Sequence, residues 1–447
     1  MAQMSVSDQE AERTVRADLP ANRRAGGSVS LMRRARRFFY HRVMRFLTLV
    51  HQLVVFLGKR IGPRPHLPAD GEGLEVLLTG RFFSSDWPVA FLRPLAASRH
   101  CSRVVVVSSY PVPDIDKVMT IYPPPWLTRI VGSTPARLLV FALTAFRRRP
   151  HIVGGFHMKV NALAATALAP WVGARALYFC VGGPTEVLDG GIWGEAKLFE
   201  RMETPDALVE RRLVKAADAC DVIITMGTGA AEFFRKKGVA VPIHVVPGGM
   251  DKERFSPAEE VAAIDLVLVG RLVEVKSIDL FLHAVRCVAD VMPNIKAVVV
   301  GEGPLRGDLE QLARNLGIDH CVKFTGFEPR VSDWLRQARI FMLTSHSEGL
   351  SLALMEAMMC GLPAVVAQVG DLGDLVQDDV NGYLVSERCA EAFAAPVLGL
   401  LADDRKYAAF SQAARRMAMR YEMAEVTLMW DGILAMLSGG GSRAASG

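Results

Sequence analysis

A chain of 447 residues is long enough for two or three domains, and its 51% apolar and 22% charged residues are typical of a soluble α/β protein with a sizeable core. The seven cysteines are scattered, without a Cys-x-x-Cys pair or zinc-ligand spacing, which argues against a disulfide scaffold or zinc module and for reduced thiols in the cytoplasm. The net charge of +5 is uneven, because residues 1–64 carry thirteen Lys and Arg against four Asp and Glu.

The basic N-terminal segment divides into two parts. Residues 1–30 are polar and lack hydrophobic periodicity, which predicts a disordered tail. Residues 31–62 predict a helix with eight Lys and Arg and no acid, whose polar positions from His41 to Gln52 form one stripe on an otherwise apolar surface. Its longest apolar run, about 13 residues, is shorter than the roughly 20 that span a bilayer. The run also starts too late for a typical signal peptide.

Two interpretations of residues 31–62 stay open. A basic amphipathic helix favours binding in the plane of an anionic membrane, so we predict a protein peripherally associated with the cytoplasmic face of the membrane. The alternative is a helix that packs on the rest of the protein with its arginines solvated. We expect no nucleic-acid partner, because no RNA- or DNA-binding motif accompanies the basic residues.

Strand patterns alternate with helical patterns from residue 63 to residue 248. Strands are expected at 73–79, 103–108, 151–156, 176–180, 221–225 and 243–246. This alternation predicts a parallel, doubly wound sheet. The segment 110–126, which contains five prolines, is expected to be a long irregular connection.

Three residues of this N-terminal domain are candidates for an acceptor site. Arg81, His157 and Gly182 each follow an expected strand, and the carboxyl ends of parallel strands share one edge of the sheet. His157 is a candidate general base, although a lone histidine is often structural. The glycine at position 182 would admit a bulky acceptor or phosphate groups.

The C-terminal half repeats the strand–helix pattern with charged residues at strand ends. Arg271 follows the strand 264–270, and Lys276 directly precedes a helix over 277–291. A guanidinium and an ammonium group in these places suit a diphosphate. The strand 295–300 runs into a tight turn at Gly301, which would let backbone approach a ligand.

Glu348 and Glu356 form a further candidate pair. The strand 338–344 leads to a turn that carries Glu348, and Glu356 lies in the expected helix 350–360. On one continuous helix the two would lie about 12 Å apart, beyond the roughly 5–10 Å of a hydrolase pair. They suit opposite ends of one extended ligand, beside a helix N-terminus that favours anions.

The order of these motifs resembles the C-terminal domain of a family 4 retaining glycosyltransferase of group 1, which has the GT-B fold. The motifs are Gly270-Arg271 with Lys276, Gly301–Leu305, Phe324–Gly326, Glu348 with Glu356, Gly361–Val365 and Asn381–Val385. The resemblance implies two doubly wound Rossmann-like domains, 63–248 and 249–425, facing each other across a cleft. Residues 426–447 would cross back as a helix and end in a flexible tail.

The resemblance also implies a role for each matching residue. Arg271 and Lys276 would neutralise the donor diphosphate, and Glu348 would face the transferred sugar. The remaining donor contacts would be Glu356 at the ribose, the backbone of Gly349, Leu350 and Ser351 at the sugar hydroxyls and phosphate, and Phe327 near the base. Neither a metal nor a cofactor is expected besides the nucleotide-sugar substrate.

The expected reaction is transfer of a sugar, with retained configuration, from a nucleotide-diphosphate sugar to an acceptor hydroxyl. The basic segment suggests a lipid-linked or membrane-associated glycan acceptor in cell-surface polysaccharide biosynthesis. A nucleotide-sugar epimerase of the same fold and a non-catalytic nucleotide-sugar-binding scaffold stay open. The chain departs from the usual family pattern at Lys276-Ser277, Pro247–Asp251 and Gly370–Asp374, and the last of these departures leaves the donor sugar undefined.

Overall fold

The computed structural model describes residues 31–69, 72–82, 86–192, 199, 201–258 and 262–439. Within these ranges the chain forms two compact units, one from residues up to 249 together with 423–439 and the other from 250–422. The boundary expected after residue 248 therefore falls one residue later. The predicted tails at residues 1–30 and 440–447 lie outside the described residues.

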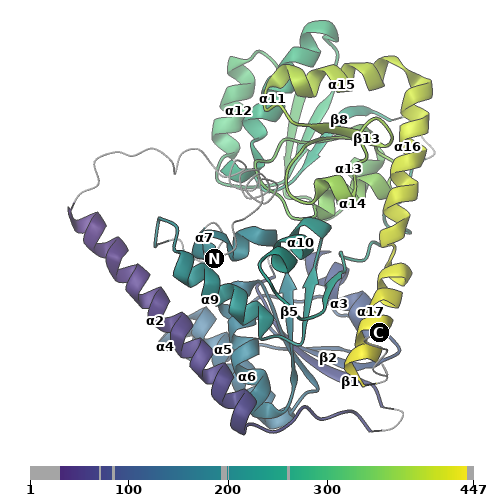
Figure 1. Ribbon diagram of the computed structural model, residues 1–447. Helices are drawn as coiled ribbons and strands as arrows, with labels where there is room; N and C mark the ends of the chain where they lie inside the picture. The colour runs from purple at the N-terminus through teal and green to yellow at the C-terminus, as the bar shows by residue number, and fades with distance from the viewer. Residues whose placement is uncertain are drawn as a thin grey trace. The chain divides into compact units, whose positions relative to one another are not determined.

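The first unit is built on a seven-stranded parallel sheet in the order β3-β2-β1-β4-β5-β6-β7 (Figure 1). Its strands are β1 (Leu74–Thr79), β2 (Cys101–Val107), β3 (Val118–Ile121), β4 (Ile152–Phe156), β5 (Arg175–Cys180), β6 (Val222–Thr225) and β7 (Ile243–Val245). The strand order reverses between β1 and β4. The doubly wound sheet expected from the alternating pattern is confirmed.

The helices of the first unit include one from the end of the chain. They are α2 (Leu31–Ile61), α3 (Asp86–Ala97), α4 (Pro125–Val131), α5 (Ser133–Arg148), α6 (Leu163–Val172), α7 (Leu188–Gly191), α9 (Ala207–Asp218), α10 (Thr228–Lys236) and α17 (Met423–Leu437). Helix α17 packs on α3, where Ser98 Oγ donates to Asp431 Oδ1 at 2.6 Å. The Trp430 ring also contacts Phe179 of β5, with ring centroids 5.6 Å apart.

The expectation of an irregular segment at 110–126 was wrong in part. Residues Val118–Ile121 form β3, which pairs in parallel with β2 from Val104↔Val118 to Val107↔Ile121. The strand has only four residues and lies at the edge of the sheet between proline-rich stretches, where proline is tolerated. Its pattern is therefore too short to stand out in the sequence.

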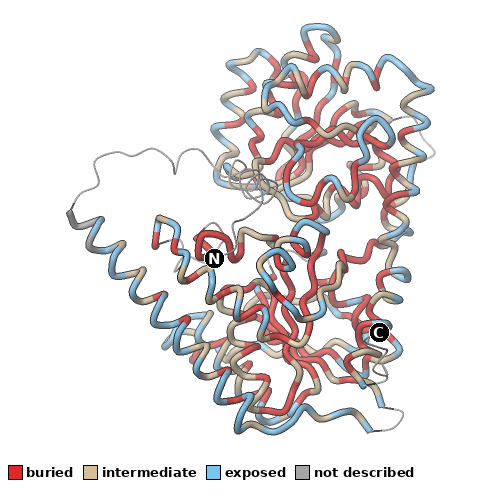
Figure 2. Tube along the Cα trace, viewed as in Figure 1, coloured by how far each residue is buried: buried red, intermediate tan, exposed pale blue. Residues whose placement is uncertain are grey.

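The second unit has a six-stranded parallel sheet in the order β10-β9-β8-β11-β12-β13. Its strands are β8 (Ile264–Val269), β9 (Ala297–Val300), β10 (Val322–Gly326), β11 (Ala338–Leu343), β12 (Ala364–Ala367) and β13 (Gly382–Val385). Its helices are α11 (Ile278–Val291), α12 (Arg306–Asn315), α13 (Val331–Arg336), α14 (Leu352–Met359), α15 (Ala390–Ala402) and α16 (Asp404–Ala418). The order reverses between β8 and β11, and the strands of both sheets are largely buried (Figure 2).

Helix α2 lies against α6 and α9 of the first unit. Met44 and Val55 point into this contact and are buried, and Met44 belongs to the same core cluster as Phe141 of α5. The alternative that this helix packs on the protein is therefore correct for one of its faces. None of the helices in the described ranges is long and apolar enough to cross a membrane.

Candidate functional site

The carboxyl edge of the second sheet brings Lys276 and Glu348 together. Lys276 ends a short 3-10 turn (Glu274–Lys276) after β8, and Glu348 lies in the loop after β11. Lys276 Nζ and Ser345 Oγ each donate to Glu348 Oε1 at 2.5 Å. This is the point where the strand order reverses, the usual ligand position in open α/β sheets. The two side chains are 17% and 9% exposed, so the ion pair faces solvent only partly.

Backbone contacts hold the two loops in register. His346 N donates to the Val275 carbonyl at 2.8 Å, and Thr344 Oγ1 donates to the Ser277 carbonyl at 2.8 Å. Ser277 has φ 45°, in the left-handed region, at the start of α11. The ion pair is thus supported by a fixed frame rather than by two independent flexible loops.

Arg388 was missed by the sequence analysis. Its guanidinium donates to the Ser345 carbonyl at 2.7 Å, to the Thr344 carbonyl at 2.9 Å and to Ser277 Oγ at 3.1 Å. It therefore joins the loops after β8 and β11 from a third position, just beyond β13. Its position in the sequence, an arginine shortly after a strand end, is the same pattern that marked Arg271 as a candidate.

Two glycines allow close backbone approach at this edge. A Cβ on Gly370 (φ 54°) would collide with the Glu348 carbonyl, so any side chain there would displace the Glu348 loop. A Cβ on Gly301 (φ 145°) would collide with the Gly270 carbonyl. The backbone that approaches Gly301 is therefore that of the neighbouring strand end, which explains the glycine without a ligand.

The other predicted donor residues lie on the segments that follow β8, β10 and β11. Arg271 is exposed just beyond β8, and Phe327 is 70% exposed just beyond β10. Ser351 caps α14 by accepting from Leu354 N at 3.3 Å, so the helix begins later than expected and Glu348 and Gly349 lie wholly in the loop. Glu356 lies within α14 and is 8% exposed.

A cavity of about 540 Å³ opens beside this edge. It is lined by residues from the 3-10 turn, the start of α11 and helix α12, with His346 at one side. Burial and the nearby charge of Arg388 lower the pKa of His346. The lining includes Ser277 and His346, which flank the ion pair, but none of Arg271, Lys276, Glu348 and Glu356.

The carboxyl edge of the first sheet is organised by Glu186, a second residue that the sequence analysis missed. Glu186 Oε1 accepts from Gly182 N at 2.6 Å and lies 2.9 Å from His157 Nδ1. Its Oε2 accepts from Met158 N at 2.5 Å and from the Tyr178 hydroxyl at 2.8 Å. Two of the predicted acceptor-side residues, His157 and Gly182, thus share one buried carboxylate. The only signal was a single acid shortly after a strand.

The protonation of this group follows from its contacts. Burial opposes ionisation of Glu186, but the charge and hydrogen bond of His157 and the backbone donors of Met158 and Gly182 outweigh it, so the pKa of Glu186 is lowered. An ionised carboxylate only accepts hydrogen bonds, so His157 Nδ1 carries a proton toward it. The Glu186 contact therefore orients the imidazole and makes Nε2 its proton-accepting nitrogen when the ring is neutral.

Further contacts constrain the same edge. His157 has φ 66°, a strained value for a residue with a side chain, and its ring stacks on Trp87 with centroids 6.5 Å apart. Arg81 is exposed after β1, where its guanidinium contacts the Tyr110 hydroxyl at 3.5 Å. The buried Arg137 donates to Thr79 Oγ1 and to Asn161 Oδ1, and burial lowers its pKa to about 10. Arg137 stays charged at neutral pH, and the nearby charge of Arg81 also lowers its pKa.

Residues 249–417 match the family model "Glycosyl transferases group 1". The chain is 32% identical over 224 residues to the D-inositol 3-phosphate glycosyltransferase of Kribbella flavida, covering 45% of this chain and 52% of that protein. Its counterpart from Catenulispora acidiphila is 33% identical over 235 residues, covering 47% and 54%. The chain therefore spans about half the length of these curated relatives.

Solved structures share the fold across most of the chain. The structure of Anabaena HepE in complex with UDP-glucose superposes with a TM-score of 0.64 at 17% identity, over 81% of this chain and 100% of HepE. Sucrose-phosphate synthase from Thermosynechococcus elongatus gives a TM-score of 0.67 at 16% identity, over 82% of this chain and 100% of that one. The two doubly wound units therefore have the GT-B architecture expected from the sequence.

Proposed function

We propose, because residues 249–417 match the family model of group 1 glycosyltransferases, that this chain moves a sugar from a nucleotide-diphosphate sugar to an acceptor hydroxyl with retained configuration. The observation that carries the proposal is the Lys276–Glu348 ion pair at the point where the second sheet reverses its strand order. Structures of HepE with UDP and with UDP-glucose support a nucleotide sugar as the ligand class.

In the proposed reaction Arg271 and Lys276 neutralise the diphosphate, and Glu348 faces the sugar. The bond between the anomeric carbon and the diphosphate oxygen breaks, and the acceptor oxygen bonds to the same face of that carbon. Because the acceptor attacks the face that the diphosphate leaves, no covalent enzyme intermediate is needed, and the leaving phosphate helps to take the acceptor proton. Fixed positive charge where the diphosphate develops its charge is the main source of rate enhancement.

The remaining donor contacts follow from the positions of the other residues. Glu356 binds the ribose, the backbone from Gly349 to Ser351 holds sugar hydroxyls and phosphate, and Phe327 stacks near the base. The exposure of Phe327 and the cap at the start of α14 support these assignments. We propose no obligate metal, so a chelator is expected to leave the initial rate unchanged.

On the acceptor side we propose a lipid-linked or membrane-associated glycan, used at the cytoplasmic membrane face in polysaccharide biosynthesis. His157, oriented by Glu186, is the candidate base, and Arg81 and Gly182 border it. The scattered positions of the seven cysteines support a reducing compartment. The relatives' name makes inositol phosphate an alternative acceptor, and the exposed guanidinium of Arg81 favours testing it.

The test is a panel of nucleotide sugars supplied with a membrane lipid extract, with inositol phosphate or with no acceptor. Nucleotide release and labelled product that require an acceptor support transfer. An epimer formed without acceptor would instead indicate a nucleotide-sugar epimerase. Nucleotide binding without turnover under every condition would favour the non-catalytic scaffold.

A further inference from the structure

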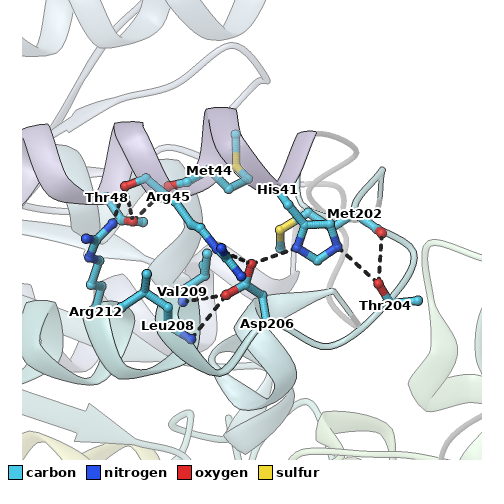
Figure 3. A network of polar contacts seen from close by, with 10 residues as sticks. All are labelled: His41, Met44, Arg45, Thr48, Met202, Thr204, Asp206, Leu208, Val209 and Arg212. Atoms are coloured by element: carbon cyan, nitrogen blue, oxygen red, sulfur yellow. Dashed lines mark hydrogen bonds and ion pairs between the residues drawn. The ribbon is translucent and has the colours of Figure 1, made fainter. Parts of the chain in front are cut away.

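Helix α2 places its polar stripe toward the protein. His41 lies between Asp206 Oδ2 (2.7 Å from Nδ1) and Thr204 Oγ1 (3.0 Å from Nε2), as Figure 3 shows. Arg45 Nε donates to the same Asp206 oxygen at 2.9 Å. One turn further on, Thr48 is 3% exposed. The polar stripe of an amphipathic helix usually faces solvent, but the polar stripe of α2 faces the protein.

The buried side is fixed at both ends of the stripe. Asp206 caps α9 by accepting from Leu208 N and Val209 N, each at 3.1 Å, so the same carboxylate anchors α2 and starts α9. Burial opposes its ionisation, but the hydrogen bonds from His41, Val209 and Arg45 outweigh it and lower the pKa of Asp206. Two turns beyond Arg45, His51 Nε2 lies 2.9 Å from Thr166 Oγ1 of α6. Together these contacts hold α2 lengthwise against the first unit.

The opposite side of α2 is apolar and exposed. We define the outer face of α2 as its exposed residues Phe38, Phe39, Arg42, Phe46, Leu49, Leu53, Phe56 and Arg60. Positions 46, 49, 53, 56 and 60 recur at steps of three and four, so they form one stripe along the helix. Phe46 is 63% exposed and Leu53 and Phe56 are each 55% exposed. A continuous row of large apolar side chains of this kind marks an interaction surface.

The charge of the helix indicates what covers this face. Residues 31–61 carry eight Lys and Arg and no Asp or Glu. Within the outer face the Arg42 guanidinium lies 4.8 Å from the Phe38 ring centre, and that of Arg60 lies 5.8 Å from the Phe56 ring centre. Arginine beside aromatic rings is typical of helices in the interfacial layer of anionic bilayers.

A second copy of the chain suits the face less well. The basic residues lie at both ends of α2, so arginines would oppose arginines whether two such helices met in parallel or antiparallel orientation. Like charges facing each other across an interface oppose association. Anionic phospholipid headgroups complement the same charges, and acyl chains complement the apolar stripe.

We propose that the outer face of α2 lies in the plane of an anionic phospholipid membrane while its polar stripe stays docked on α6 and α9. The proposal deepens the membrane association included in the proposed function. It makes the membrane anchor a rigid part of the unit that carries His157, in place of a flexible arm. Deletion of the segment is a poor test, because it would also remove buried Met44 and expose the surfaces of α6 and α9.

The experiment measures binding of the full chain to vesicles without donor or acceptor, so its outcome is independent of sugar transfer. Vesicles of phosphatidylcholine with about one-third phosphatidylglycerol are compared with vesicles of phosphatidylcholine alone. We expect preference for the anionic vesicles. The double variant Phe46→Glu/Leu53→Glu should bind at least about tenfold more weakly, because both side chains leave the apolar layer. Leu428→Glu changes an equally apolar residue of α17 that is 61% exposed, and should bind as wild type does.

Two results would overturn the proposal. One is unchanged vesicle binding by the double variant when circular dichroism shows it to be folded. The other is a dimer in sedimentation analysis that the double variant dissociates, which would make a second copy the occupant. Hydrogen exchange separates a docked anchor from a detached arm. Protection of the Leu208 and Val209 amides should stay within about twofold on vesicle binding, whereas detachment of α2 would raise their exchange.

Discussion

The two sheets share a strand order over six strands, but their carboxyl edges differ in how they hold charge. At the second sheet the Lys276–Glu348 pair joins two loops and is partly exposed. At the first sheet Glu186 is 2% exposed and interacts with four donor groups, including His157. The common topology decides where polar groups gather, while the local contacts decide whether a charge can meet a ligand or serves to orient its neighbours.

Among the variants that test this difference, Glu348→Gln is expected to have the largest effect, and the effect is on turnover. Turnover should fall about 100- to 1,000-fold, the usual cost of losing one charge-stabilising group at a reacting centre. Binding of the nucleoside diphosphate should persist, because Arg271 and Lys276 remain. Steady-state kinetics and calorimetric titration measure the two quantities, with the exposed Glu391→Gln as control. Wild-type turnover in the Glu348 variant would remove it from the site.

The corresponding change at the first sheet is expected to affect stability. Glu186→Gln keeps the size of the side chain but turns an amide NH₂ toward groups that are themselves donors. We expect a loss of about 2–4 kcal/mol in the free energy of unfolding, measured with urea. The nucleotide affinity of this variant should not change. The control Glu232→Gln, at an exposed position, should change neither the free energy of unfolding nor the nucleotide affinity. A loss below about 0.5 kcal/mol would contradict the role of Glu186 as the organising carboxylate.

Lys276→Ala tests the ligand-facing part of the second edge. Loss of a charge-assisted contact is worth about 1.5–3 kcal/mol, so nucleotide affinity should fall roughly 10- to 100-fold. Exposed Lys296→Ala removes the same charge from the same unit and should leave affinity unchanged. Equal affinities of the two variants would show that Lys276 serves only to hold the Glu348 loop.

The smallest effect concerns the first unit alone and depends on pH. Burial lowers the pKa of His51 to about 4, although its hydrogen bond to the Leu163 backbone acts in the opposite direction. In the unfolded chain the pKa of His51 is near 6.5. Between about pH 4 and pH 6.5 the unfolded state therefore binds more protons than the folded state, and stability falls as the pH drops through this range. We expect about 1 kcal/mol less stability at pH 5.5 than at pH 7.5 from this group. His51→Gln retains a partner for Thr166 and should lose that increment; an unchanged pH dependence would contradict the assignment.

Much of the second unit could be predicted because its signals are local. Arg271 and Lys276 lie in the connection that follows a buried strand, and parallel strands place such connections at one edge whatever the remaining packing. Arg388 and Gly370 could not be assigned in the same way. Their significance depends on contacts with Ser345 and Glu348, which are distant in sequence, and such pairings leave no periodic pattern.

Helix α2 shows the same division between local pattern and tertiary contact. Its extent, its basic charge and the grouping of its polar residues follow from the sequence of residues 31–61, because helical periodicity is a property of the segment itself. Which side faces the protein was decided only by partners more than a hundred residues away, Asp206 and Thr166. Buried polar groups require hydrogen-bond partners, so the positions of those partners turned the polar stripe inward and left the apolar face outside.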